Sequence, residues 1–238
     1  MKDIVFHVHI PKTAGSFVRD ALIDSGHVVV NRFVELDRPD DGLVRGHYSK
    51  EIATPGGTLL AGHFKADEFF FFRLFKRTRY IAVIREPFDW VCSLYFYVLR
   101  REHHYMHSLA RSGFEGFFSH KDMLNMQSRY VAGRPLAYLN KLGFLSDNLL
   151  SHIAVMRAKK GFTCVASQEH LGYMFSTLRK KGLMKSDNRG SGSVNVNKLR
   201  PESIDVDSST KEKFKKLYAP DYELYSWAFH HSKPNDES

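Results

Sequence analysis

The chain has 238 residues, of which 43% are hydrophobic, and an α/β protein of this size forms one core, so we expect a single domain over residues 1–238. Two cysteines cannot form a disulfide framework, no stretch approaches the roughly 18 apolar residues that span a membrane, and the 13 histidines lack zinc-site spacing, so we expect no metal. The formal net charge of +9 indicates an anionic partner. No zinc-finger, homeodomain or RNA-recognition signature is present, so we expect a phosphorylated cofactor or an anionic glycan rather than nucleic acid.

Short apolar segments alternate with helical patterns along the chain. The predicted strands are Ile4–His9, Val28–Val30, Thr58–Ala61, Tyr80–Ile84 and Phe162–Ala166. The predicted helices are Gly15–Ser25, Pro87–Arg100, Leu145–Lys160, Glu169–Lys181, Ser208–Tyr218 and Asp221–His231. This alternation predicts an α/β fold, a three-layer sandwich in which a mostly parallel sheet is flanked by helices. The polar segment 186–192 is a predicted flexible loop, and residues 233–238 are a predicted disordered tail.

The first strand leads directly into a basic loop and a helix. The apolar run Val5–Ile10 ends at Pro11, and the loop K-T-A-G-S-F then opens the first predicted helix. The first N–H groups of a helix have no intrahelical partner and can bind an anion, which the helix dipole also attracts. The residues that we expect to contact this anion are Lys12, Thr13, Ala14, Gly15, Ser16 and Phe17. The junction therefore predicts a phosphate site.

The position of the lysine separates this loop from the ATP-binding P-loop. The motif G-x-x-x-x-G-K-[ST] places its lysine after the second glycine. Here Lys12 follows a proline and precedes the only glycine of the loop. Taken alone, the hexapeptide could also be a helix start that carries an incidental lysine.

A second strand-to-helix junction begins at Arg85. Pro87 suits the first turn of a helix, where its missing N–H is not needed, and Ser93 lies about two turns into that helix on the side that faces back. A guanidinium and a hydroxyl can bind one phosphate from two directions. The alternative is a surface arginine paired with Glu86 or Asp89, and a small serine at a helix packing face. Two such junctions in one chain favour the phosphate interpretation.

The predicted middle strand ends in the pair Gly62-His63. Ligands of parallel α/β sheets bind at the carboxyl ends of the strands, so we expect Lys12, His63 and Arg85 to lie together. An imidazole with an ordinary pKa of about 6.5 can accept a proton near neutral pH. His63 is therefore the predicted catalytic base, although a lone histidine at a strand end is otherwise more often structural.

The order of these motifs resembles that of the PAPS-dependent sulfotransferases, where PAPS is 3′-phosphoadenosine 5′-phosphosulfate. The motifs are P-K-T-x-G-[ST], then Gly-His, then an arginine followed by [DE]-Pro and by a serine eight residues beyond it. The resemblance is to the carbohydrate-modifying branch, which includes the heparan sulfate 2-O-sulfotransferases and their bacterial relatives. It implies a P-loop-like fold, a 5′-phosphosulfate site at Lys12–Phe17 and a 3′-phosphate site at Arg85 and Ser93. It further implies that His63 removes the acceptor proton and that Lys12 stabilises the leaving oxygen, without a metal.

Two later segments are also similar to this family. The stretch N-M-Q-S-R-Y-V-A-G resembles N-x-Q-x-R-x-x-[AS]-G, and S-V-N-V-N-K resembles a loop that closes over the cofactor. On this resemblance Gln127 and Arg129 are predicted substrate contacts and Lys198 is a predicted cofactor contact. His104 lies in a basic segment after the second junction and is a predicted contact of an anionic acceptor. The alternatives are helix capping, sheet-edge polarity and a solvated loop.

The sequence therefore predicts a PAPS-dependent O-sulfotransferase that acts on a hydroxyl group, with a carbohydrate as the expected acceptor. Golgi members of the resembled family carry an anchor and a stem before the first loop, so we expect a cytoplasmic, bacterial protein here. Two other classes remain open. One is a P-loop-like small-molecule kinase that uses ATP, which the missing G-K-[ST] order disfavours. The other is a non-catalytic binder of an anionic glycan or nucleic acid.

Overall fold

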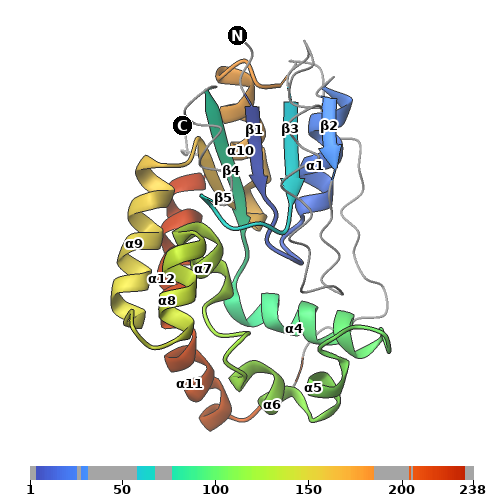
Figure 1. Cartoon of the computed structure of the whole chain (residues 1–238), viewed down its shortest axis with the longest axis vertical. Helices are drawn as coiled ribbons and strands as arrows, with labels where there is room; N and C mark the ends of the chain where they lie inside the picture. The colour runs from blue at the N-terminus through green and yellow to red at the C-terminus, as the bar shows by residue number, and fades with distance from the viewer. Residues whose placement is uncertain are drawn as a thin grey trace.

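A parallel sheet of five strands forms the centre of the molecule (Figure 1). The computed structural model describes residues 4–25, 28–31, 58–67, 77–184, 204 and 206–233. The strands are β1 (Ile4–Val8), β2 (Val28–Asn31), β3 (Thr58–Gly62), β4 (Thr78–Ile84) and β5 (Cys164–Ser167). Their order is β2-β3-β1-β4-β5, and each neighbouring pair is parallel. All five lie where the sequence predicts them, with ends that differ by no more than two residues.

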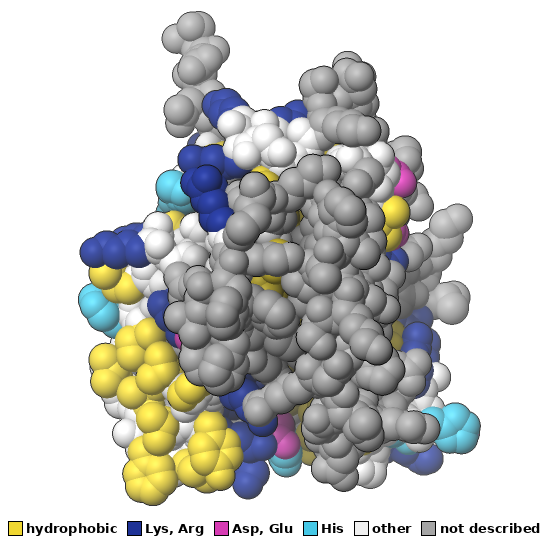
Figure 2. All heavy atoms as spheres, turned by 45° about the horizontal axis from the view of Figure 1, so that its top comes forward, with side chains coloured by type: hydrophobic (Ala, Val, Ile, Leu, Met, Phe, Trp, Pro, Cys, Tyr) yellow, Lys and Arg dark blue, Asp and Glu magenta, His cyan; other side chains and the backbone are white. Residues whose placement is uncertain are grey.

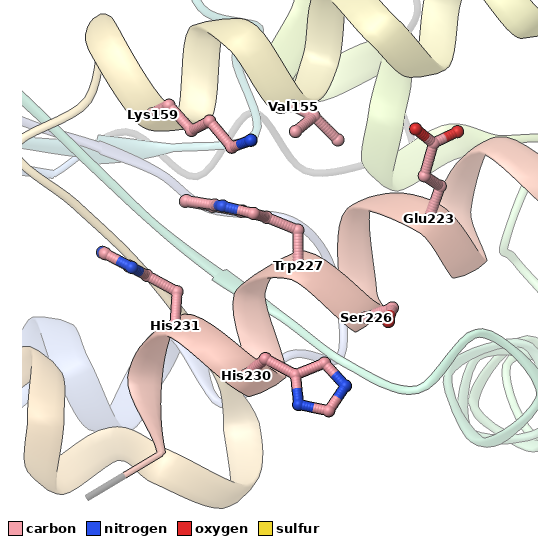
Figure 3. A pocket seen from close by; sticks show the side chains of 7 residues that line it. All are labelled: Val155, Lys159, Glu223, Ser226, Trp227, His230 and His231. Carbon is pink, nitrogen blue, oxygen red and sulfur yellow. The ribbon is translucent and has the colours of Figure 1, made fainter. Parts of the chain in front are cut away.

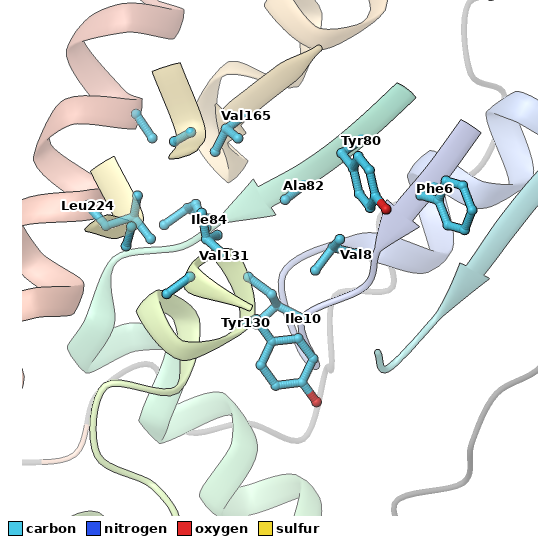
Figure 4. Packing of buried hydrophobic residues seen from close by; sticks show 14 of the residues in the cluster. Phe6, Val8, Ile10, Tyr80, Ala82, Ile84, Tyr130, Val131, Val165 and Leu224 are labelled. Carbon is cyan, nitrogen blue, oxygen red and sulfur yellow. The ribbon is translucent and has the colours of Figure 1, made fainter. Parts of the chain in front are cut away.

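Helices cover both faces of the sheet because the strands are apolar on both sides. On one face, α7 (Met126–Ala132), α9 (Asp147–Lys160) and α12 (Ala219–Ser232) pack against Phe6, Val8 and Ile84. Figure 4 shows Ile84 of β4 close to Val131 of α7 and Leu224 of α12. On the other face, α1 (Gly15–Asp24) and α10 (Leu171–Lys180) pack against the alternate residues, such as Val5 and Val83. Side chains alternate along a strand, so each strand supplies both cores.

A second group of helices lies beyond the carboxyl ends of the strands, at the bottom of Figure 1. It consists of α4 (Pro87–Leu99), α5 (His107–Arg111), α6 (Phe114–Ser119) and α11 (Ser208–Leu217), packed around the fully buried Trp90 and Phe214. α4 begins at Pro87 and is capped by Glu86, whose Oε2 accepts a hydrogen bond from the Asp89 N–H at 2.6 Å. This cap fixes the direction in which α4 leaves the sheet.

The region between 100 and 145 differs from the sequence prediction, which assigned it no element. It contains α5, α6, α7 and α8 (Arg134–Lys141), helices of five to eight residues that are too short for a clear 3.6-residue periodicity. A 3-10 turn at Gln168–His170 precedes α10. None of the described helices combines the length and apolarity that crossing a bilayer requires. The predicted loop 186–192 and residues 234–238 of the predicted tail lie outside the described residues.

Candidate active site at the carboxyl ends of the strands

The loop after β1 turns sharply before α1 begins. Lys12 and Ala14 both adopt left-handed backbone conformations, with φ angles of 63° and 64°. Such conformations cost on the order of 1 kcal/mol or more for a residue with a side chain, so surrounding contacts must hold them. Two contacts do so: the buried Thr13 hydroxyl donates to the Ile10 carbonyl at 2.8 Å, and Trp90 Nε1 donates to the Pro11 carbonyl at 2.7 Å. The second contact ties the loop to α4.

The turn leads directly into α1, whose first N–H groups have no partner within the helix. α1 has no side-chain cap at Ala14 and no acidic residue in its first turn. Alternating backbone conformations that direct successive N–H groups to one side form anion-binding concavities. Phe17 packs edge-on against Phe175 at a ring separation of 5.7 Å, so its side chain belongs to the core. The Ser16 side chain is half-buried on the first turn.

The ring of His9 leaves no room for a side chain at position 15, so this residue has to be glycine. A Cβ at this position would lie 2.0 Å from Cδ2 and 2.2 Å from Nε2 of His9. The sequence predicts Gly15 as one of the contacts of the anion. The structure adds a packing reason, because the imidazole of His9 already fills the space on its side-chain face.

Two cations of the site contact α4. Lys12 Nζ lies 4.7 Å from the ring centroid of Tyr97, and the guanidinium carbon of Arg101 lies 4.2 Å from the same ring. These are cation–π distances. Tyr97 is not among the predicted site residues, although its position four residues after Ser93 places both on one face of α4.

Arg85 links the two predicted phosphate sites. Its Nη1 donates to the Lys12 carbonyl at 3.3 Å, and its Nη2 lies 3.7 Å from Oδ2 of Asp89. Asp89, Ser93 and Tyr97 follow one another at intervals of four along α4. Ser93 therefore lies between the residue that contacts Arg85 and the residue that contacts Lys12.

His63 follows β3 and is held by the backbone of His9, the first residue after β1. Its Nδ1 lies 2.7 Å from the carbonyl oxygen of His9, and the two rings are 4.6 Å apart. A carbonyl can only accept, so Nδ1 carries the proton and Nε2 is the proton-accepting nitrogen. Burial lowers the pKa of His63 below its ordinary 6.5, and the hydrogen bond to His9 opposes this only in part. The ring is therefore neutral near pH 7, as a general base must be.

Two more histidine rings lie behind His63: His9 contacts His63, and His7 contacts His9. His7 stacks on His9 at 5.3 Å and is fully buried. Its pKa is lowered to about 3, chiefly by burial and further by electrostatic interaction with Arg19 and, when it is protonated, with His63. The pKa of His9 is also lowered, again chiefly by burial. A chain of neutral rings therefore extends from the candidate base into the core.

The remaining predicted residues occupy different surroundings. Gln127 is buried and bonds the backbone of Arg85. Arg129 lies within the helices, where its Nε donates to Asn140 and its Nη1 to the Lys121 carbonyl, both at 2.8 Å. His104 is buried with its ring edge-on to Tyr97, and its Nδ1 accepts from the Met106 N–H at 3.2 Å.

Lys12, His63, Arg85, Ser93 and Gln127 are thus brought to one end of the sheet, and Arg129 is committed to internal hydrogen bonds. Lys198 lies outside the described residues, as does the predicted loop 193–198. Within the part of the chain that the structure describes, no group of three or more His, Cys, Asp and Glu side chains could hold a metal ion.

Two surface features lie away from this site. An open cavity of about 670 Å³ between α9 and α12 is lined by Val155, Lys159, Glu223, Ser226, Trp227, His230 and His231, none of which is a predicted site residue (Figure 3). Hydrophobic side chains also gather at the lower left of the face in Figure 2. Large apolar side chains are exposed in α8 and the segment that follows it, including Tyr138 and Phe144, at 62% and 78%.

The comparisons with known proteins bear on the fold. No family model and no curated protein sequence matches the chain. Among solved structures, the chain is similar to a sulfotransferase from Alicyclobacillus acidocaldarius, with a TM-score of 0.51 and 14% sequence identity over 97% of this chain and 96% of the other. At this identity the similarity concerns the fold alone. Together with the strand order β2-β3-β1-β4-β5, it confirms the predicted P-loop-like α/β sandwich.

Proposed function

We propose that this protein is a PAPS-dependent O-sulfotransferase that transfers the sulfuryl group to a hydroxyl of an acceptor, with a carbohydrate as the acceptor class. The observation that carries the proposal is the hydrogen bond from Arg85 to the Lys12 carbonyl, which joins the two predicted phosphate sites at the end of the sheet where His63 follows β3. Two anion-binding elements next to one candidate base suit a nucleotide with phosphates at both its 5′ and 3′ positions. ATP has no 3′-phosphate.

The residues fit such a substrate by charge and by donor type. The N–H groups at the start of α1 and the ammonium of Lys12 would hold the 5′-phosphosulfate. The guanidinium of Arg85 and the hydroxyl of Ser93 would hold the 3′-phosphate. The Asp89 carboxylate near Arg85 is 56% exposed, so a phosphate can replace it as the partner of the guanidinium at little desolvation cost.

The transfer itself needs a base and charge stabilisation. His63 Nε2 takes the proton of the acceptor hydroxyl as that oxygen forms its bond to sulfur. The bond between sulfur and the oxygen of the 5′-phosphate breaks in line with the attack, and the products are the sulfated acceptor and PAP, the 3′,5′-bisphosphate. Lys12 and the N–H groups of the loop stabilise the negative charge that develops on the leaving oxygen.

Calorimetric titration tests the cofactor. We expect PAP to bind more tightly than adenosine 5′-phosphate, and more tightly than ATP with magnesium. Lys12→Ala and Arg85→Ala should each weaken PAP binding on the order of tenfold or more, the effect of losing a charge-assisted contact. Lys159→Ala, which removes a lysine from the distant α9–α12 cavity, should leave it unchanged. Preferential binding of ATP with magnesium would overturn the proposal in favour of a kinase.

A second experiment tests the base. Turnover is measured as PAP release from PAPS in the presence of chemically desulfated heparin. We expect His63→Ala to lose turnover and to keep the PAP affinity of the parent, because the histidine acts on the acceptor rather than on the nucleotide. A His63→Ala protein that remains active would refute the assigned role.

A further inference from the structure

One buried amide satisfies both backbone groups of Arg85. Gln127 Oε1 accepts a hydrogen bond from the Arg85 N–H at 2.9 Å, and Gln127 Nε2 donates to the Arg85 carbonyl at 2.8 Å. Gln127 has no solvent exposure. Arg85 is the first residue after β4, so its backbone has left the ladder of the sheet and needs other partners. The side-chain amide of Gln127 makes the two backbone hydrogen bonds that a neighbouring strand would otherwise make.

Gln127 is itself held from α12. Asp221 is fully buried, and its carboxylate accepts hydrogen bonds from the N–H groups of Gln127, at 3.2 Å, and Ser128, at 2.7 Å. Asn125 precedes α7 in a left-handed conformation with φ 52°. α7 thus begins against a fixed carboxylate, and its first turn delivers the amide of Gln127 to the end of β4.

This geometry gives Gln127 a role different from the one that the sequence predicted. Both polar atoms of its side chain are used on Arg85, and the residue is enclosed in the protein. A direct contact with an acceptor would require it to give up these bonds. Its influence on a ligand therefore passes through Arg85.

We propose that Gln127 is a positioning residue that fixes the backbone of Arg85, so that the guanidinium is directed at the 3′-phosphate and the site selects nucleotides that carry this group. The proposal rests on the proposed function, because it assumes that Arg85 binds this phosphate. A guanidinium on an unfixed backbone still attracts anions, but it loses the alignment on which bidentate recognition depends. Selectivity, rather than nucleotide binding as a whole, is the property that Gln127 supplies.

The measured quantity is the ratio of two dissociation constants, that of adenosine 5′-phosphate over that of PAP. We expect Gln127→Met, which keeps the length of the side chain and removes both hydrogen bonds, to lower this ratio by on the order of tenfold. Its affinity for adenosine 5′-phosphate should stay near that of the parent. Gln127→Glu keeps an acceptor for the Arg85 N–H and should lower the ratio less. Gln168→Met makes the same change at another glutamine and should have no effect.

The outcomes separate the inference from the proposed function. A parent protein that does not prefer PAP to adenosine 5′-phosphate would refute the proposed function. A parent that prefers PAP, with folded Gln127 variants that keep the same ratio, would overturn the role of Gln127 alone. An equal loss of both affinities would also overturn it, because general damage to the nucleotide site is not a loss of selectivity. Circular dichroism establishes folding, and Gln127→Glu serves if Gln127→Met does not fold.

Discussion

Gly15 and His9 provide a test of how the anion loop is packed against the candidate base. A Cβ at residue 15 would lie 2.0 Å from the nearest atom of the His9 ring, well inside van der Waals contact, and the nearest His9 atoms belong to a rigid imidazole. Overpacking of this kind costs about 1–3 kcal/mol of folding free energy. Gly15→Ala should therefore destabilise the protein, although alanine is the better helix former by about 1 kcal/mol. It should also reduce turnover, because the displaced His9 ring contacts His63.

A double-mutant cycle measured by urea unfolding checks this reasoning. In a His9→Ala background the ring is gone, so the further change Gly15→Ala should be neutral or stabilising. The interaction free energy between the two positions should reach about 2 kcal/mol, within the range found for contacting residues. An equal cost of Gly15→Ala in both backgrounds would show that the glycine is required for another reason. Gly172→Ala is the control, since a Cβ there would meet nothing within 4 Å.

Three predictions concern pH. His7 has a pKa of about 3 in the folded protein and about 6.5 when unfolded, so its contribution to stability is lost as pH falls below 6.5, about 2 kcal/mol between pH 7 and pH 5. Urea unfolding of His7→Leu should show a smaller acid loss than the parent, and an equal loss would contradict the assignment. The pKa of His63 is lowered, so the rising limb of kcat/KM should lie below pH 6.5; a midpoint above pH 7 would argue against His63 as the base. Burial raises the pKa of Asp221 to about 6, so its effect has the opposite sign, and stability is lost as pH rises from about 4 to 6. Asp221→Asn should lack this loss of stability, which is about 3 kcal/mol in the parent, and thermal melting at pH 4 and pH 6 measures it. A variant whose stability depends on pH as the parent's does would contradict the raised pKa of Asp221.

The sequence predicted the sheet well because each strand is a local signal. An apolar run bounded by a turn, such as the one that ends at Pro11, depends on neighbours along the chain. The helices predicted after the first and fourth strands favoured a parallel sheet, which the structure confirms. The helices between 100 and 145 were not predicted, because they lack such a local signal. They are short, and packing against distant parts of the chain stabilises them: α5 and α6 pack around Trp90 and Phe214, and α7 packs against the sheet.

One part of the candidate site was likewise predictable from the sequence, and the other part depends on the tertiary structure. The identity of its charged groups and the two strand-to-helix junctions that carry Lys12 and Arg85 were determined by the sequence, because each junction is built from consecutive residues. Only the tertiary structure decided how they are held. The bond from Arg85 to the Lys12 carbonyl joins residues 73 apart, and the bond from Gln127 to Asp221 joins residues 94 apart. Contacts at such separations leave no periodic trace in a single sequence, since they depend on where the sheet brings its strand ends together.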